Sequence, residues 1–155
     1  MVPLPQGLIV SVLDVSKRHI IDNFLLNEYT IDQKINQVYD LKFVIGDEAF
    51  VQSTLMDLLS QIPEEFSISQ NYPNPFNPVT KMDFSVAQTG KVNIVIYNLL
   101  GQTVKTLVNE TMDYGYHSIV WDGHDELGNP VSSGVYFSEL RARGFRQSKK
   151  MLLLK

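Results

Sequence analysis

The chain has 155 residues, of which 44% are hydrophobic, and its formal net charge is −4 at neutral pH. This length allows one or two domains, no apolar run approaches the roughly 20 residues of a transmembrane helix, and the negative charge argues against a nucleic-acid-binding protein. The sequence contains no cysteine, which excludes disulfides, thiolate catalysis and cysteine-ligated zinc.

The opening segment, Met1–Leu8, has neither a positively charged region nor an unbroken apolar region, so it does not match a secretory signal peptide. It has two prolines among its first five residues, which is typical of the middle of a longer chain. We therefore expect the chain to be a fragment.

Residues 1–52 are predicted to form three or four strands, from β-rich runs at Leu8–Asp14, His19–Leu26 and Tyr39–Ile45. Three or four strands are too few for a closed sandwich. We expect this part to be a partial β domain, the end of a larger cargo domain, whose incomplete sheet could associate with another copy.

The run Tyr39–Ile45 alternates apolar and polar residues. This alternation predicts a half-buried antiparallel strand. Its core-facing side chains are expected to be Tyr39, Leu41, Phe43 and Ile45, with Asp40 and Lys42 on the opposite face.

A helical pattern follows in Ser53–Ile62, where Leu55, Leu58, Leu59 and Ile62 have the spacing of one helix face. Ser53 or Thr54 is available as the N-cap, and Pro63 ends the helix. We predict that residues 53–65 are a linker with a short helix; a partner-binding helix is the less favoured alternative.

The C-terminal part, residues 66–155, is predicted to be a sandwich. It opens with the proline-rich segment Tyr72–Pro78, and seven of the nine glycines lie between residues 90 and 144 as regular turn signals. Seven strands are expected, at residues 66–70, 79–86, 91–98, 103–108, 116–121, 134–141 and 146–154.

The predicted fold class is therefore all-β. It comprises a C-terminal seven-stranded immunoglobulin-like antiparallel sandwich, preceded by a partial β-sheet region and a short helical connector. The inward faces are predicted to carry Met82, Phe84 and Val86 on one strand and Val92, Ile94 and Ile96 on the next. Trp121, the only tryptophan, is the expected core anchor.

Few residues suggest catalytic or metal chemistry. The three histidines, His19, His117 and His124, form no metal-binding pattern, and no nucleophile elbow or phosphate-binding loop is present. Asp122, Asp125 and Glu126 are weak candidates for calcium ligands, because their loop lacks EF-hand spacing and also has ordinary turn chemistry. No cofactor and no enzymatic activity are predicted.

Basic residues are concentrated at the C-terminus. Residues 141–155 hold six of the thirteen lysines and arginines and no acidic residue, so residues 1–140 carry a net charge of −10. Two interpretations remain open: an edge strand protected from aggregation by its cations, and a recognition tag on an acidic body.

Five segments of the C-terminal part occur together in a known order. They are Gln70–Pro78 (QNYPNPFNP), Val95–Gln102 (VIYNLLGQ), His117–Gly123 (HSIVWDG), Val131–Phe137 (VSSGVYF) and Lys149–Lys155 (KKMLLLK). Together they resemble the type A C-terminal sorting domain of the type IX secretion system. They also resemble the related immunoglobulin-like module of the flagellar hook-capping protein.

The resemblance implies a non-catalytic role in exported proteins of Bacteroidetes-type bacteria. Such a domain presents its protein to the outer-membrane translocon, and a sortase-like protease commonly removes it and attaches the protein to the cell surface. The expected location is therefore secreted or on the cell surface, reached through the periplasm and outer membrane. By position, the family's end motifs correspond to Gly134, Val135 and Tyr136 and to the terminal Lys149, Lys150 and Lys155.

The terminal strand is expected to offer a free edge to a receptor, with strand addition as the recognition mode. On this view, removing Met151–Lys155 should abolish export and leave most of the fold. The alternative function is a structural or adhesive module of a surface or hook-capping-type assembly. The implied partners are the type IX translocon and a sortase-like protease, with no nucleic acid.

Overall fold

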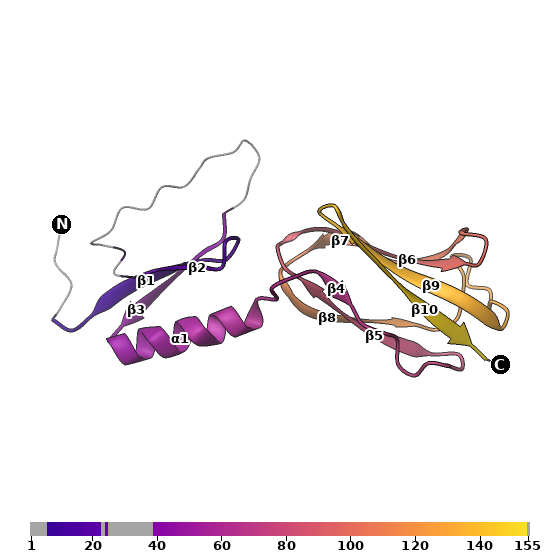
Figure 1. Cartoon of the computed structure of the whole chain (residues 1–155), viewed down its shortest axis with the longest axis horizontal. Coiled ribbons are helices and arrows are strands. Elements are labelled where there is room, and N and C mark those ends of the chain that lie inside the picture. Colours follow the sequence, from indigo (N-terminus) through magenta and orange to yellow (C-terminus); the bar gives the residue numbers. More distant parts are fainter. Residues whose placement is uncertain (1–5, 23, 25–38, 155) are drawn as a thin grey trace. The chain divides into compact units, whose positions relative to one another are not determined.

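The structure, a computed structural model, describes residues 6–22, 24 and 39–154 (Figure 1). The chain divides into two compact units, Met1–Ile62 and Pro63–Lys155. Within the described residues, no helix is long and apolar enough to cross a membrane.

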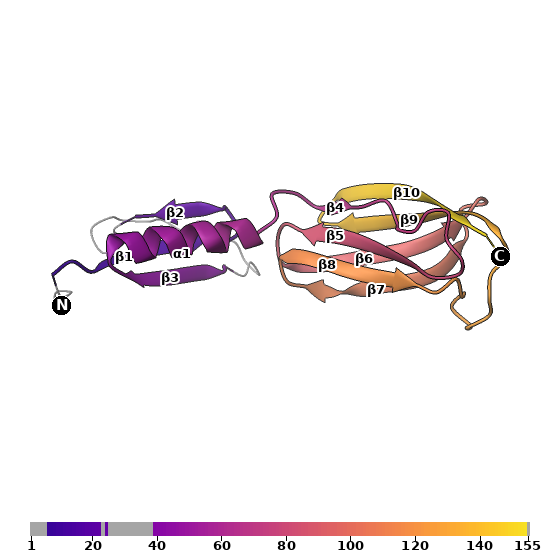
Figure 2. The ribbon, with the colours of Figure 1, turned by 90° about the horizontal axis from the view of Figure 1, so that it is seen from below.

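The first unit is a three-stranded antiparallel sheet with one helix packed on it (Figures 1 and 2). Its elements are β1 (Ile9–Asp14), β2 (His19–Ile21), β3 (Leu41–Gly46) and α1 (Glu48–Gln61), with the strands in the order β2-β1-β3. Val12 and Leu13 of β1 and Val51 and Leu55 of α1 are fully buried. The predicted run His19–Leu26 is a strand only over β2, and residues 23 and 25–26 of that run lie outside the described part.

The helix begins earlier than the sequence pattern predicted. Asp47 is the N-cap, and its side chain accepts a hydrogen bond of 2.9 Å from the backbone N–H of Phe50. Ser53 and Thr54 are therefore within the helix rather than at its start. An Asp side chain satisfies an orphan N–H as well as Ser or Thr does. The earlier cap lengthens the helix by at least six residues, among them the buried Val51.

The predicted orientation of β3 is wrong. Val44 is buried, whereas Phe43 and Ile45 are 58% and 56% exposed. Gly46 faces the same side as Val44, and a Cβ at Gly46 would lie only 2.5 Å from the ring of Phe50 in α1. The helix therefore covers the Val44 face of the sheet, and the exposed Phe43 packs edge-on against Phe24 at a ring distance of 5.6 Å.

The second unit is a sandwich of two antiparallel sheets, as predicted. One sheet has the order β10-β9-β6-β7 and the other β4-β5-β8, and Figure 1 shows them as two layers. The strands are β4 (Ser67–Ile68), β5 (Thr80–Val86), β6 (Gly90–Asn98), β7 (Thr103–Met112), β8 (Gly115–Trp121), β9 (Gly134–Ala142) and β10 (Phe145–Leu153). The seven expected strands are present; β4 is shorter than expected and β7 four residues longer.

The core of the sandwich comes from the inward positions of each strand. Met82, Phe84 and Val86 of β5 and Val92, Ile94 and Ile96 of β6 are all buried, which confirms the predicted faces. Each fully buried aliphatic or aromatic side chain contributes about 1.5–3 kcal/mol relative to exposure. The two-residue periodicity of the sequence is thus the main determinant of this unit.

Candidate functional site

The residues that the sequence analysis selected lie on the last hairpin, β9–β10. Its two strands pair from Phe145↔Ala142 to Leu153↔Gly134, around a two-residue turn at Arg143 and Gly144. Both turn residues have positive φ, 44° and 84°, which is the conformation of a type I′ hairpin turn. The turn fixes the register, so the start of β9 lies opposite the end of β10.

Gly134, Val135 and Tyr136 pair with Leu153, Leu152 and Met151. Lys150 and Lys149 come next along β10, opposite Phe137 and Ser138. Tyr136 and Lys149, the nearest members of the two end motifs, are 13 positions apart in the sequence. The structure therefore brings these two motifs to one end of one hairpin. Lys155 lies outside the described residues.

Tyr136 is an anchor of the core rather than an exposed recognition residue. It is 7% exposed, its ring packs edge-on against Trp121 at 5.1 Å, and its hydroxyl donates a 2.7 Å hydrogen bond to the carbonyl oxygen of Ser132. Burial raises the pKa of the Tyr136 phenol. Tyr136 thus anchors the start of β9 to the core of the sandwich.

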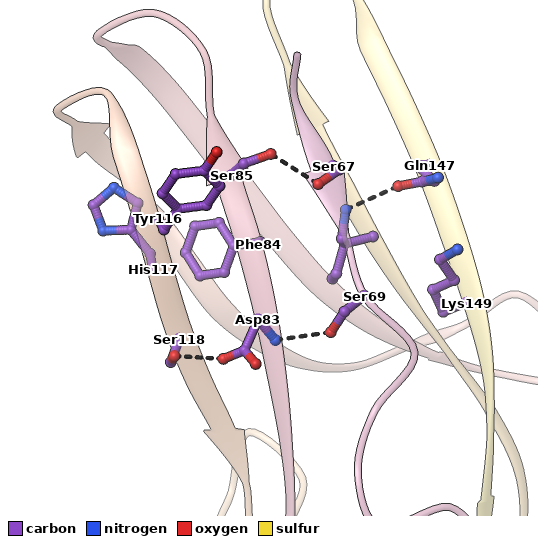
Figure 3. A pocket seen from close by; sticks show the side chains of 11 residues that line it. Ser67, Ser69, Asp83, Phe84, Ser85, Tyr116, His117, Ser118, Gln147 and Lys149 are labelled. Atoms are coloured by element: carbon purple, nitrogen blue, oxygen red, sulfur yellow. Dashed lines mark hydrogen bonds between the residues drawn. The ribbon is translucent and has the colours of Figure 1, made fainter. Parts of the chain in front are cut away.

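The two lysines point in opposite directions, because successive side chains of a strand alternate between faces. Lys150 is exposed on the outer face of β10. Lys149 is half-buried and lines a pocket with Gln147, beside β4 (Figure 3). Among the described residues, neither ammonium group has an ion-pair partner, so both cations remain available to a ligand.

The outer edge of β10 is capped by the proline-rich segment, residues 70–78, here called the strap. The backbone of Phe76 makes two hydrogen bonds with it, from Phe76 N–H to Leu152 O and from Leu154 N–H to Phe76 O, both 2.9 Å. The side chain of Asn74 accepts from Leu152 N–H at 2.9 Å and donates to Lys150 O at 3.4 Å. The strap therefore replaces a neighbouring strand.

This cap corrects the expectation of a free terminal edge. The carbonyl oxygen of Lys150, both backbone groups of Leu152 and the N–H of Leu154 are already bonded to the strap, so a receptor strand cannot pair with these groups while the strap is in place. Sequence reasoning missed Asn74 and Phe76 as capping residues. The sequence signal that could have found Asn74 is its position between two prolines. Because the prolines have no backbone N–H, the side-chain amide of Asn74 supplies the hydrogen-bonding groups there.

The weak calcium candidates are Asp122, Asp125 and Glu126. The first two use their carboxylates in hydrogen bonds within their own loop, and Glu126 bonds the loop to β7. Asp125 Oδ1 accepts from the N–H groups of Leu127 and Asn129 at 2.9 and 2.8 Å, and Glu126 Oε1 accepts from Thr106 N–H at 2.6 Å. The hydrogen bond from the Asn129 backbone is the main reason that the pKa of Asp125 is lowered. In the described part of the chain, no three His, Asp or Glu side chains gather in a way that could hold a metal ion.

The pocket of Figure 3 has a volume of about 360 Å³ and lies over β4, β5 and β8 beside β10. Its polar groups bond to one another: Ser67 with Ser85 at 2.8 Å, and Ser118 to Asp83 at 2.5 Å. Hydrogen bonds from Lys81 and then Ser118 lower the pKa of Asp83. His117 and Ser118 are consecutive in β8 and point to opposite faces, so His117, Ser118 and Asp83 do not form a catalytic triad.

The five motif segments meet at one end of the sandwich. The ring of Trp121 lies 5.5 Å from that of Phe76 in the strap and 5.1 Å from that of Tyr136. Asn98 of β6 pairs with Tyr136, and Leu153 of β10 pairs with Gly134. Segments that are far apart in the sequence therefore build a single structure around Trp121.

Comparison with known proteins supports an immunoglobulin-like relation for the second unit. Residues 77–144 match the family model described as the FlgD Ig-like domain, a family of non-catalytic structural domains. A search of curated protein sequences returns no match.

Three solved structures are similar to the chain. PorZ, a surface component of the type IX secretion system of Porphyromonas gingivalis, is 15% identical over 59% of this chain and 12% of its own, with a TM-score of 0.40. Dimeric latent PorU of the same organism is 16% identical over 97% of this chain and 12% of its own, with a TM-score of 0.45. FlgD of P. aeruginosa is 22% identical over 48% of this chain and 59% of its own, with a TM-score of 0.37. The chain thus spans 12% of the length of PorZ and of PorU.

Proposed function

We propose that residues 66–155 are a C-terminal sorting domain, which directs an exported protein through the outer membrane by the type IX secretion system. On this proposal, residues 1–52 belong to the exported cargo, and the mature protein is secreted or held at the cell surface. The implied partners are the translocon and a sortase-like protease.

The observation that carries the proposal is the convergence of the five resembling segments at one end of the sandwich. A purely structural module would need the buried residues at this end of the sandwich, such as Trp121 and Tyr136, to keep its fold. It would not need cations at Lys149 and Lys150, which have no ion-pair partner in the described part of the chain. We infer that the buried residues build this end and that the lysines present it to the translocon.

The join between the units is the proposed cleavage region. Glu64 and Glu65 are exposed, whereas Ile62 and Pro63 are buried. Cleavage after the buried pair would leave both units intact, since exposed connecting residues are the preferred sites of proteolysis.

Deletion of the last strand end is not a clean test of this function. Met151 and Leu153 are fully buried, so removing Met151–Lys155 would open the core. Truncating a buried Leu or Met side chain typically costs 2–5 kcal/mol. The expectation that this deletion leaves most of the fold intact is therefore replaced by a test at the lysines.

The test fuses the whole chain behind a signal peptide and a fluorescent reporter, in a host with a type IX system and in a matched strain without the translocon. Reporter should reach the cell surface or medium only when the translocon is present. The double variant Lys149→Ala/Lys150→Ala should reduce that export at least tenfold without lowering the melting temperature. The control Lys81→Ala/Lys105→Ala removes the same charge elsewhere and should export normally.

Two results would contradict the proposal: reporter retained in the periplasm of both strains although folded, or equal export by the lysine variant and the parent. Retention would favour the second candidate function, a structural module of a surface or hook-capping-type assembly. The match of residues 77–144 to the FlgD Ig-like domain is the observation that favours this second candidate.

A further inference from the structure

A second surface lies at the other end of the sandwich, near the β9–β10 turn, and its lining residue Arg146 is about 14 Å along β10 from Lys150, where the strap's contacts begin. It is a groove of about 540 Å³ on the outer face of the four-stranded sheet. We call it the basic groove; its polar lining residues are Lys91, Asn93, Asn109, Arg141, Arg143 and Arg146. It includes none of the residues assigned to sorting.

Four of these residues form a straight row across the sheet. Asn109 of β7 pairs with Asn93 of β6, Asn93 pairs with Arg141 of β9, and Arg141 pairs with Arg146 of β10. Neighbouring strands are about 4.8 Å apart, so the row is about 14 Å long. Hydrogen-bonding side chains are therefore presented at regular intervals along one line.

The cations of the row are held in place by one buried carboxylate. Glu139 is 4% exposed, and its two oxygens accept from Arg141 Nε at 2.5 Å and from Arg146 Nε at 2.6 Å. Ser148 also donates to Glu139, at 3.1 Å. Because Glu139 is bonded to the Nε atoms, it orients both guanidinium groups, and the terminal amino groups of Arg146 have no partner among the described residues.

Arg143 is fixed independently. Its backbone occupies the left-handed region at the turn, which a non-glycine residue adopts at a cost, and its Nη2 donates to the carbonyl oxygen of Thr89 at 3.1 Å. The side chain therefore lies across the neighbouring β5–β6 turn, close to Gly90. This contact holds a third guanidinium beside the row.

The charge of the groove is unbalanced. Four cations line it, and no carboxylate is among its lining residues in the described part of the chain. With Glu139 counted beneath them, the local charge is about +3, in a chain whose net charge is −4. The groove is therefore suited to an anionic ligand.

We propose that the basic groove binds an acidic polysaccharide. Guanidinium groups form paired hydrogen bonds with carboxylate and sulfate, and the amides of Asn93 and Asn109 can both donate to and accept from sugar hydroxyls. A shallow row of about 14 Å matches a linear chain of several sugars better than a single small anion. Single-stranded nucleic acid would need exposed aromatic platforms, and the only aromatic residue in the lining is the half-buried Phe145.

The experiment measures binding of the whole chain to polygalacturonate and dextran sulfate by isothermal titration calorimetry, with neutral dextran as the blank. The variant Lys91→Gln/Arg146→Gln keeps the Glu139–Arg141 pair and should weaken binding about tenfold or more. The variant Arg143→Asn, whose new residue tolerates the turn conformation, should weaken it severalfold. The control Lys81→Gln/Lys105→Gln removes equal charge outside the groove and should change binding less than twofold.

Thermal unfolding of each variant separates loss of the site from loss of the fold. The proposal is overturned if the control variant loses as much affinity as the groove variant, because binding would then report only net charge. It is also overturned if no acidic polysaccharide binds, or if duplex DNA or anionic phospholipid vesicles bind more tightly at the same salt concentration. None of these outcomes bears on export, so the sorting proposal is tested separately.

Discussion

The strap makes a prediction that can be worked out from its contacts. Replacing Asn74 with alanine removes the acceptor for Leu152 N–H at 2.9 Å and the donor to Lys150 O at 3.4 Å. A neutral hydrogen bond of normal length contributes about 1 kcal/mol, and one at 3.4 Å contributes little. Asn74 is exposed, so water can replace part of the loss.

We therefore expect Asn74→Ala to lower the free energy of unfolding of the second unit by about 0.5–1.5 kcal/mol. For a unit of this size, about 1 kcal/mol corresponds to a fall in melting temperature of roughly 4–8 °C. The loss should be local: hydrogen exchange of the Leu152 amide should speed up strongly, while amides of the central strand β6 should change only with global stability.

Asn74→Asp is the matched control. It keeps the side-chain acceptor for Leu152 N–H and removes only the weaker donor, so it should retain most of the stability and most of the protection. The reasoning is refuted if the aspartate variant is destabilised as much as the alanine variant, or if the Leu152 amide keeps its protection in Asn74→Ala. Either result would mean that the hydrogen bond from Leu152 N–H to Asn74 Oδ1 does not stabilise this edge of β10.

Two further predictions concern the sandwich. Burial would raise the pKa of Glu139, but hydrogen bonds from Arg146, Arg141 and Ser148 outweigh burial and lower that pKa. The ionised Glu139 should therefore stabilise the folded protein fully above the ordinary glutamate pKa of about 4.3. This stabilisation should be lost as pH falls through the lower pKa of the folded state. Melting temperatures from pH 3 to 6 should thus rise more steeply for the parent than for Glu139→Gln, and parallel curves would contradict this. Gly123→Ala should lower the free energy of unfolding by about 1–3 kcal/mol, because Gly123 has a φ of 73° and an added Cβ would lie 3.1 Å from Pro78 O. An unchanged urea midpoint would show that the loop relaxes without cost and would contradict this prediction.

The site was only partly predictable from the sequence. The order of the motifs and the hairpin around Gly144 could be read directly, because turn residues and two-residue periodicity are local properties. The role of Tyr136 could not be predicted from such local properties. A tyrosine in a strand motif can serve as an exposed contact or as a core anchor, and only the packing against Trp121 and the hydrogen bond to Ser132 assign it to the core.

The sequence by itself determined the strands of the second unit and their buried faces, since alternation along one strand specifies which side chains share a face. Tertiary structure alone decided which face is covered where both carry apolar residues: α1 covers Val44 and leaves Phe43 and Ile45 exposed. It also decided that the edge of β10 is closed by Asn74 and Phe76. The physical reason is that burial and edge capping depend on which distant segment packs against a strand, and local periodicity carries no information about that neighbour.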